Sequence, residues 1–534
     1  MIDTKALRER ILDLAIRGKL VPQDPNDEPA SVLLERIRAK KQQMVKEGKL
    51  KPKDIKNDTI IFKGEDNLHY EQFQDGTVKC IEDEIPFEVP EGWAWSRLLP
   101  FTIKIGAGST PKGGSAVYNN SGIKFIRSQN VYDDGLVLND VAYISEEINQ
   151  KKSGSIVMPQ DILLNITGGS IGRCALVPDD FDIANVNQHV IIIRLVEVSL
   201  RQYIHSVIIS PYIQKQIFSK QVGSGRGGLS AETTSTFLIP IPPIQEQYAI
   251  QAKLQLCISS VSAITVEKTN ITNLVSTAKA KILDLAVRGK LVPQNPNDEP
   301  ASVLLDRIRA AKEELVKQGK IKQDKKESVI LKGEDNSYYE KVGGVSVCID
   351  SKIPFDLPKG WCWERLGNVA SIARGGSPRP IKDFLTDADN GINWIKIGDA
   401  EQGGKYIFST AEKIIPEGLS KTRYVNKGDF LLTNSMSFGR PYILKTDGCI
   451  HDGWLVIGDT EGIFSQDFLY YTLSSEFMYK SFCELAAGST VKNLQLDTVK
   501  SVFFPIPPYA EQIRIAEHVE EMYSLINSIE KRLS

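Results

Sequence analysis

The chain has 534 residues, of which 41% are apolar and 25% are charged, a length that predicts roughly three to five domains, each able to bury a core. No run approaches the roughly 18 consecutive apolar residues of a membrane span, and the first residues, MIDTKALRERILDL, are charged and amphipathic, so we expect a cytoplasmic protein. The seven scattered cysteines indicate neither a disulfide framework nor a zinc knuckle. Because the net charge is −2, DNA binding must be argued from local features.

A long internal repeat organises the chain. Residues 11–51 read ILDLAIRGKLVPQDPNDEPASVLLERIRAKKQQMVKEGKLK, and residues 282–322 read ILDLAVRGKLVPQNPNDEPASVLLDRIRAAKEELVKQGKIK. Shorter matches continue the repeat, namely KGEDN, IPF, GWxW and PIPPxxEQ, and their offset falls from 271 to 265 along the chain. Such a gradual drift is expected of two diverged copies, so the chain is a tandem duplication of a unit of about 270 residues.

In chain order the sequence predicts seven segments. Two of them are mixed α/β domains in which short β-type runs alternate with Gly, Asp and Asn turn signals. The two domains share their flanking motifs and differ in the sequence between them, so we expect each to recognise a different target. The seven segments are an N-terminal helix (1–20), a basic arm and linker (21–84), the first mixed domain (85–243), a central long helix (244–289), the repeated arm and linker (290–352), the second mixed domain (353–508) and a C-terminal long helix (509–534).

The central helix carries the most regular pattern. Apolar residues recur at alternating spacings of four and three from Ile250 to Leu285, without Pro or Gly, which predicts a coiled-coil rod of roughly 50 Å. Residues 515–533 repeat the first half of this stripe and residues 7–14 repeat its second half. We therefore predict that the two chain ends meet, completing a second long helix that packs antiparallel to the first in a circular, pseudo-twofold arrangement. An intermolecular coiled coil is the alternative.

Taken together, these motifs resemble those of the specificity (S) subunit of type I restriction-modification systems, over nearly the whole chain. The resemblance rests on the duplicated ILDLA-RGKLVPQ segment, the paired GWxW openings and the two PIPPxxEQ helix starts. DILLNITGGSIGR from Asp161 and DFLLTNSMSFGRP from Asp429 look like one block of the family's target recognition domains. The implied fold is α+β, with two mixed α/β target recognition domains separated by an antiparallel coiled coil.

The resemblance also implies a function. The chain would be a non-catalytic subunit that reads a bipartite, asymmetric target in double-stranded DNA, one half-site per recognition domain, with the helices setting the unread gap. Its partners would be two methylation subunits and two restriction subunits, with no membrane. S-adenosylmethionine, ATP and magnesium would be bound by those partners and no cofactor by this chain, in a bacterial or archaeal cytoplasm.

Polar residues that follow strand-like runs are the candidate DNA contacts, because Arg pairs well with guanine and Asn or Gln with adenine. In the first domain they are Lys124, Arg127, Gln129, Asn130, Asn165, Thr167, Ser170, Arg173 and Arg226. In the second domain they are Lys396, Thr433, Asn434, Ser435, Ser437, Arg440, Ser489, Thr490, Lys492 and Asn493. Each can equally be a solvated turn residue or a strand cap, and the sequence does not separate base contacts from phosphate contacts.

Each arm is locally basic. Residues 36–56 hold nine Lys or Arg against two acidic residues, and residues 307–326 hold eight against three. Such a stretch indicates a phosphate-neutralising arm, a docking surface for acidic partners, or a solvated helix face.

The sequence shows no motif for catalysis. Both Pro-Pro pairs follow Ile, unlike the Asn/Asp-Pro-Pro-aromatic motif of adenine methyltransferases, and GSGRGG at 223–228 opens no βαβ unit. No Walker motif occurs, and the five histidines lack metal-ligand spacing, so we expect no catalytic residue and no metal site. Two rival hypotheses remain. One is a DNA adenine methyltransferase with unrecognised motifs, which would transfer methyl groups without a partner subunit. The other is a coiled-coil scaffold without sequence preference.

Overall fold

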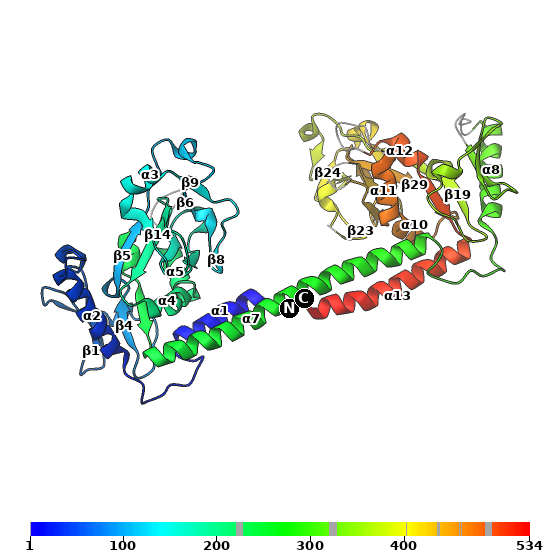
Figure 1. The fold of residues 1–534 in the computed structure, drawn as a ribbon. Coiled ribbons are helices and arrows are strands. Elements are labelled where there is room, and N and C mark those ends of the chain that lie inside the picture. Colours follow the sequence, from blue (N-terminus) through cyan, green and yellow to red (C-terminus); the bar gives the residue numbers. More distant parts are fainter. Residues whose placement is uncertain are drawn as a thin grey trace. The chain divides into compact units, whose positions relative to one another are not determined.

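The computed structural model describes residues 2–220, 228–319, 328–401, 403–434, 438–458, 460, 462–485 and 494–533, which fall into two units (Figure 1). The units are Ile2–Lys268 and Thr269–Ser534. Their boundary lies inside one continuous helix, α7 (Ile244–Val287). The internal repeat marks the same place, because the C-terminal residue of the sequence maps onto position 269 of α7.

In the first unit, α1 (Thr4–Ile16) runs antiparallel along the first half of α7 (Figure 1). The helix begins where the Asp3 carboxylate accepts a hydrogen bond from the Ala6 N–H at 3.0 Å, which satisfies one of the unpaired amides of the first turn. Leu12 and Ile16 then share one buried cluster with Ile250. The apolar stripe read from the sequence is therefore a helix–helix contact in this unit.

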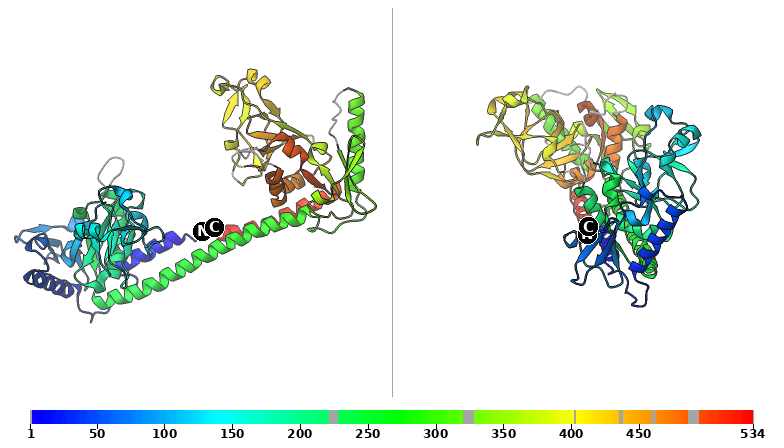
Figure 2. Two further views of the ribbon diagram at one scale, coloured as in Figure 1. Left: turned by 45° about the horizontal axis from the view of Figure 1, so that its top comes forward. Right: turned by 90° about the vertical axis from the view of Figure 1, so that its left-hand side faces the viewer.

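In the second unit, α13 (Tyr509–Leu533) runs antiparallel along the second half of α7 (Figure 2). Ile515 and Val519 pack in one cluster with Ile282, and Lys279 pairs with Glu530 at 2.7 Å. Each half of α7 thus has its own partner helix, as the two-piece stripe predicted. That the two chain ends meet stays a prediction.

Among the described residues, α7 is the one helix that is long and apolar enough, by length and composition, to cross a membrane. Only 17% of its most apolar stretch is buried within the chain, with Leu256 and Leu274 strongly exposed. A single such helix is weak evidence for a membrane span, because a helix whose exposed apolar side binds another protein can have the same length and composition.

Each arm consists of one helix and a small antiparallel sheet, which the sequence analysis did not predict. In the first unit the elements are α2 (Ala30–Lys46), β1 (Ile60–Lys63), β2 (His69–Gln72) and β3 (Val78–Cys80). In the second unit they are α8 (Ala301–Lys317), β16 (Ser328–Lys332), β17 (Tyr338–Val342) and β18 (Val345–Cys348). Lys41, one of the nine basic residues of the stretch 36–56, is buried and donates to Asp58 at 2.8 Å, so it helps to hold α2 in place.

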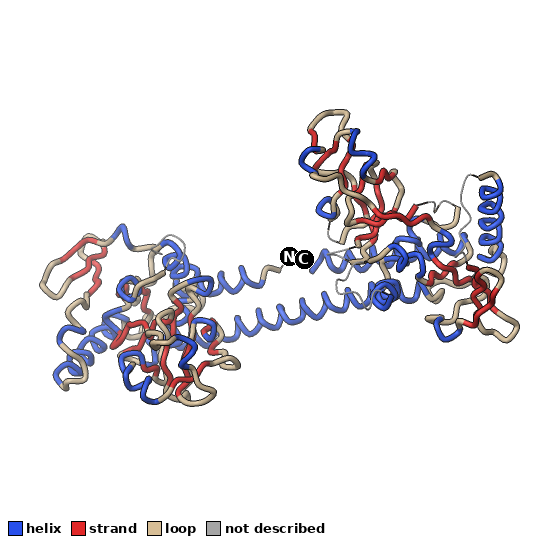
Figure 3. Tube along the Cα trace, turned by 90° about the horizontal axis from the view of Figure 1, so that it is seen from above, coloured by secondary structure: helices blue, strands red, loops and turns tan. Residues whose placement is uncertain are grey.

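The first recognition domain contains two four-stranded sheets, in the orders β12-β11-β14-β5 and β10-β13-β6-β9. Figure 3 draws strands in red and helices in blue along the chain. The strands of the first sheet are β5 (Thr102–Ala107), β11 (Ile162–Asn165), β12 (Cys174–Leu176) and β14 (Val190–Leu195). Those of the second are β6 (Ile123–Ile126), β9 (Ala142–Ile144), β10 (Ile156–Val157) and β13 (Ala184–Val186). Two helices, α4 (Arg201–Ile208) and α5 (Pro211–Ser219), follow, and β15 (Leu238–Ile241) pairs with β4 (Ala94–Arg97).

The second recognition domain has two five-stranded sheets, in the orders β20-β29-β26-β27-β23 and β21-β24-β22-β28-β25. Their strands are β20 (Ser371–Arg374), β21 (Leu385–Thr386), β22 (Ile392–Ile395), β23 (Tyr406–Ile407), β24 (Glu412–Ile414), β25 (Arg423–Val425), β26 (Phe430–Thr433), β27 (Pro441–Leu444), β28 (Gly448–Ile450) and β29 (Trp454–Gly458). The helices are α10 (Gln466–Leu473), α11 (Glu476–Leu485) and α12 (Leu496–Ser501), and β30 (Phe503–Ile506) pairs with β19 (Cys362–Arg365).

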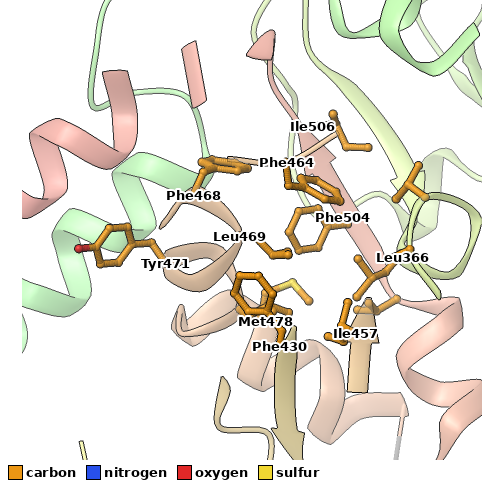
Figure 4. Packing of buried hydrophobic residues seen from close by; sticks show 14 of the residues in the cluster. Leu366, Phe430, Ile457, Phe464, Phe468, Leu469, Tyr471, Met478, Phe504 and Ile506 are labelled. Atoms are coloured by element: carbon orange, nitrogen blue, oxygen red, sulfur yellow. The ribbon is translucent and has the colours of Figure 1, made fainter. Parts of the chain in front are cut away.

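The central strands are apolar on both faces because both faces are covered. Phe430 and Leu432 of β26 join the cluster beneath α10 and α11, as Figure 4 shows for Phe430, whereas Leu431 faces a second cluster with Trp454. Side chains alternate across a strand, so a run such as FLLT serves two cores at once. Full burial of each such side chain contributes about 1.5–3 kcal/mol.

The repeated motifs of the first unit converge where the recognition domain meets α7. Glu246, in the first turn of α7, accepts hydrogen bonds from Gln23 Nε2 at 3.0 Å and from Trp93 Nε1 at 2.8 Å. Gly18 follows α1 at φ 64°, and a Cβ there would fall 2.3 Å from the Pro90 ring. Burial raises the pKa of the Glu246 carboxyl, against the hydrogen bonds that lower it. We call this contact of the RGKLVPQ, GWxW and PIPPxxEQ motifs the junction.

The second unit builds the same junction on α13. Gln294 Nε2 donates to Glu511 Oε1 at 3.2 Å, and Glu511 lies in the first turn of α13. Gly289, at φ 63°, takes the place of Gly18, with its added Cβ 2.5 Å from the Pro358 ring and 2.9 Å from the Trp361 indole. The glutamine–glutamate bond and the glycine packing are therefore made twice, whereas the tryptophan N–H donates to the glutamate in the first unit only.

Replacing Glu246 by Ala removes both acceptors of the first junction. We expect the free energy of unfolding to fall by about 1–3 kcal/mol, because the buried Trp93 N–H is left without a partner, whereas Gln23 Nε2 keeps the Gly18 carbonyl at 2.6 Å. Glu246→Gln keeps an acceptor for Trp93 and should lose less. Urea unfolding of the full chain measures both, with Lys253→Ala on the exposed side of α7 as a control expected within about 0.5 kcal/mol of the parent. A Glu246→Ala chain as stable as that control would contradict the junction.

Candidate nucleic-acid interface

Four loops meet at one edge of the first recognition domain. They follow β5, β6 and β11, and the fourth joins β13 to β14. Asn165 Nδ2 donates to the Ser128 carbonyl at 2.7 Å, and the Thr167 hydroxyl lies 2.6 Å from His189 Nδ1. We call these four loops, with their counterparts after β20, β22 and β26 and between β28 and β29 in the second domain, the polar edge of each domain.

The same close approach closes both polar edges. A Cβ on Gly108, after β5, would fall 1.9 Å from the Val186 carbonyl oxygen. A Cβ on Gly375, after β20, would fall 2.2 Å from the His451 carbonyl oxygen. No side chain fits at either position. Glycine therefore lets the loop after β5 lie against the turn before β14, and the loop after β20 lie against the turn before β29.

Three predicted contacts of the first domain are held by carboxylates. Lys124 pairs with Asp182, and the Gln129 amide donates to Asp140. Arg127 Nη2 donates to Asp140 Oδ1 at 3.1 Å. Their side chains are part-exposed at the polar edge or on the adjoining strand β6, and these carboxylates hold them in place.

Four predicted contacts are buried, and their hydrogen bonds shape the loops. Asn130 Oδ1 accepts from the Arg127 N–H at 3.0 Å, and Asn165 reaches across to the β6 loop. In the second domain, Thr433 Oγ1 accepts from the Arg440 N–H at 2.9 Å, and Asn434 Nδ2 donates to the Asp452 carbonyl at 2.8 Å. These side chains position the loops and are turned away from solvent.

The other predicted contacts are divided between exposed residues and residues outside the described part of the chain. Ser170 is half-buried, and the Arg173 guanidinium lies over the Tyr132 ring at 4.5 Å. Lys396 pairs with Glu412 at 2.6 Å, and Arg440 is exposed. Those that lie outside the described residues are Arg226, Ser435, Ser437, Ser489, Thr490, Lys492 and Asn493.

Sequence reasoning missed the turn that precedes β14 and its counterpart that precedes β29. Gln188 is exposed, its Oε1 accepts from the Thr110 hydroxyl and its Nε2 lies 3.1 Å from His189 Nε2. In the second domain, Asp452 accepts from Ser377 Oγ at 2.9 Å and from Arg379 Nη2 at 3.2 Å. The signal for this turn in the sequence is VNQHV, in which three consecutive polar residues separate the last valine of β13 from the first valine of β14.

The electrostatics of Asp452 favour its charged form. Burial raises the pKa of this carboxyl, but the hydrogen bond from Ser377 and the charges of His451 and Arg379 outweigh it and hold the pKa below its ordinary value. Asp452 is therefore an anion that keeps Arg379 at the edge. Among the described residues no group of three His, Cys, Asp or Glu is placed to hold a metal ion.

Comparison with known proteins identifies the family. Residues 90–273 and 358–534 match the model described as type I restriction modification DNA specificity domain, which covers more than half of the chain, so the chain belongs to that family. It is a specificity subunit, a non-catalytic component of a type I restriction-modification complex. This confirms the resemblance drawn from the repeated motifs.

Full-length relatives and one solved structure agree with this assignment. The specificity subunit of the type I restriction enzyme EcoEI from Escherichia coli is 28% identical over 99% of this chain and 90% of its own length. That of EcoAI, also from Escherichia coli, is 27% identical over 98% and 90%. A structure from work on complex assembly and conformational transition of the type I R-M system covers 84% of this chain and 94% of its own, with a TM-score of 0.53 and 17% identity, which shows the fold. The expected fold class, two mixed recognition regions joined by long helices, is confirmed.

Alanine at Gly108 tests the close approach at the polar edge. We expect a loss of about 1–3 kcal/mol of unfolding free energy, because the added Cβ collides with a backbone carbonyl that cannot move freely. Gly106→Ala, two residues earlier, meets nothing within 4 Å and serves as the matched control, expected within about 0.5 kcal/mol of the parent. Urea unfolding compares them, and equal losses for the two variants would refute the packing described here.

Proposed function

We propose that this chain is the sequence-recognition subunit of its complex and that the polar edge of each recognition domain reads one half of a bipartite, asymmetric DNA target. One observation supports the proposal most directly: the two edges share a frame and differ in their side chains. Gly108 and Gly375 close the two edges in the same way, whereas Gln188 and His189 stand in one turn and His451 and Asp452 in the other.

The chemistry of the edges suits base recognition. Amide, guanidinium, hydroxyl and carboxylate groups gather there, and these are the groups that distinguish base pairs in the major groove. A scaffold without sequence preference needs none of this difference, because non-specific binding rests on phosphate contacts. The unlike edges therefore favour a reader of two unlike half-sites over the scaffold.

The long helices suit the task of fixing the gap between the half-sites. Two readers held by one rigid helix prefer half-sites about one turn of DNA, roughly 34 Å, apart, since both must face the same side of the duplex. We propose that α7 sets this spacing and that its exposed apolar side chains, among them Leu256 and Leu274, meet the methylation subunits.

The rest of the complex follows from the family. We propose that two methylation and two restriction subunits join this chain and bring S-adenosylmethionine, ATP and magnesium with them, in the cytoplasm of a bacterium or archaeon. The part-buried and exposed residues among those predicted from the sequence remain proposed DNA contacts at or beside the two edges, namely Lys124, Arg127, Gln129, Thr167, Ser170, Arg173, Lys396 and Arg440.

The test is methylome sequencing of a host that expresses this chain with its methylation subunit. We expect one split motif, and exchange of residues 85–243 for another reader should change one half of that motif and leave the other half and the spacer intact. Methylation by the purified chain alone would support the rival methyltransferase. A complex that binds all duplexes equally would support the scaffold instead.

A further inference from the structure

The Gln188 carboxamide is held in one orientation by two neighbours. Its Oε1 accepts from the Thr110 hydroxyl, and because an amide nitrogen only donates, His189 Nε2 must be the acceptor of the 3.1 Å contact with Gln188 Nε2. The proton of the neutral imidazole then lies on Nδ1 and is shared with the Thr167 hydroxyl at 2.6 Å. The chain of hydrogen bonds therefore runs through three of the four loops.

This arrangement leaves one N–H and one oxygen lone pair of Gln188 free to point outward. A carboxamide with one donor and one acceptor side by side matches the N7 and N6 positions of adenine in the major groove. Since Gln188 is exposed while Asn187 beside it is buried, it is the residue of this turn that presents its amide to solvent.

The matching turn in the second domain presents a different group. Asp452 Oδ1 accepts from Ser377 and Oδ2 from Arg379 Nη2, so the carboxylate holds the guanidinium by one nitrogen. The Asp452 carbonyl is itself fixed by Asn434 Nδ2 at 2.8 Å and by Arg374 Nε at 3.2 Å. The side chain of Arg379 is 81% exposed, and its remaining N–H groups match O6 and N7 of guanine.

We infer that the turn before β14 reads an A·T pair through Gln188, and that the loop after β20 reads a G·C pair through Arg379, with Asp452 of the turn before β29 as its positioning residue. The inference rests on the proposed function and adds to it the class of base pair that each half-site must contain. It also assigns Thr110 and His189 the task of fixing the Gln188 amide.

The test measures discrimination between base pairs by the complex of this chain with its methylation subunit. Duplexes carrying the methylated motif, and the same duplexes with single base-pair substitutions, compete for the complex at one salt concentration. We expect Gln188→Ala to lower discrimination at one A·T pair of one half-site by roughly tenfold or more. Arg379→Lys, which loses the bidentate fork, and Asp452→Asn should both relax one G·C pair of the other half-site.

Each variant carries its own control for folding, because the half-site read by the other domain must keep its full discrimination. Gln150→Ala, an exposed amide on α3 (Glu146–Lys151) of the same domain, should leave every position unchanged. If Gln188→Ala weakens all duplexes equally, or behaves as Gln150→Ala does, the inference is overturned. If the parent complex shows no split motif at all, the proposed function itself fails.

The positioning role of Asp452 is tested separately by comparing single and double variants, because a purely structural role would give a different result. Asp452→Asn and Arg379→Lys should relax the same single base pair, and the double variant should relax it no further than either alone, because both changes act on one guanidinium. Additive losses spread over several positions would overturn the assignment of Asp452 as the positioning residue.

Discussion

The buried glutamate at the start of each long helix is the contact on which the rest of the molecule depends. Glu246 lies in the first turn of α7 and holds Trp93 of the recognition domain and Gln23 of the segment after α1. A carboxylate in a first helical turn is also favoured by the helix dipole. Because this contact joins three chain segments, it fixes the direction in which a recognition domain leaves its helix. In the second unit Glu511 holds the matching glutamine, Gln294.

Two kinds of residue are separated in each recognition domain. Gly108, Gly375 and the buried side chains of Asn165 and Thr433 build the loops and admit little change, because each meets the backbone at close range. The exposed side chains at the tips of the turns pack against few other residues, so replacing them disturbs the domain little. A chain built in this way can change what it reads by altering the tips while the frame and the junction stay as they are.

The sequence predicted the repeated parts well and the polar edge only in part. Helix pairing followed from the register of apolar residues and the duplication from motifs present twice, whereas the contact between those motifs at the junction was not predicted. The small arm sheets were missed, because their strands are only three to five residues long and β1, β3 and β18 bury no side chain. Asn165 and Asn434 were chosen as contacts because polar residues at strand ends look alike in sequence, whether they bind a neighbouring loop or solvent. Gln188 was missed because it lies in a turn of only three polar residues between two apolar strands.

We propose that α7 sets the distance between two recognition domains that each bind their half-site independently. Insertion of four helix-forming residues between Lys268 and Thr269 tests it, because each half of α7 keeps its own partner helix. Four residues lengthen the helix by about 6 Å, close to the rise of two base pairs, and turn it by about 40°, close to the twist of one base pair. Methylome sequencing should then show both half-sites unchanged with a spacer longer by about one or two base pairs. An unchanged spacer with both half-sites retained would contradict the account.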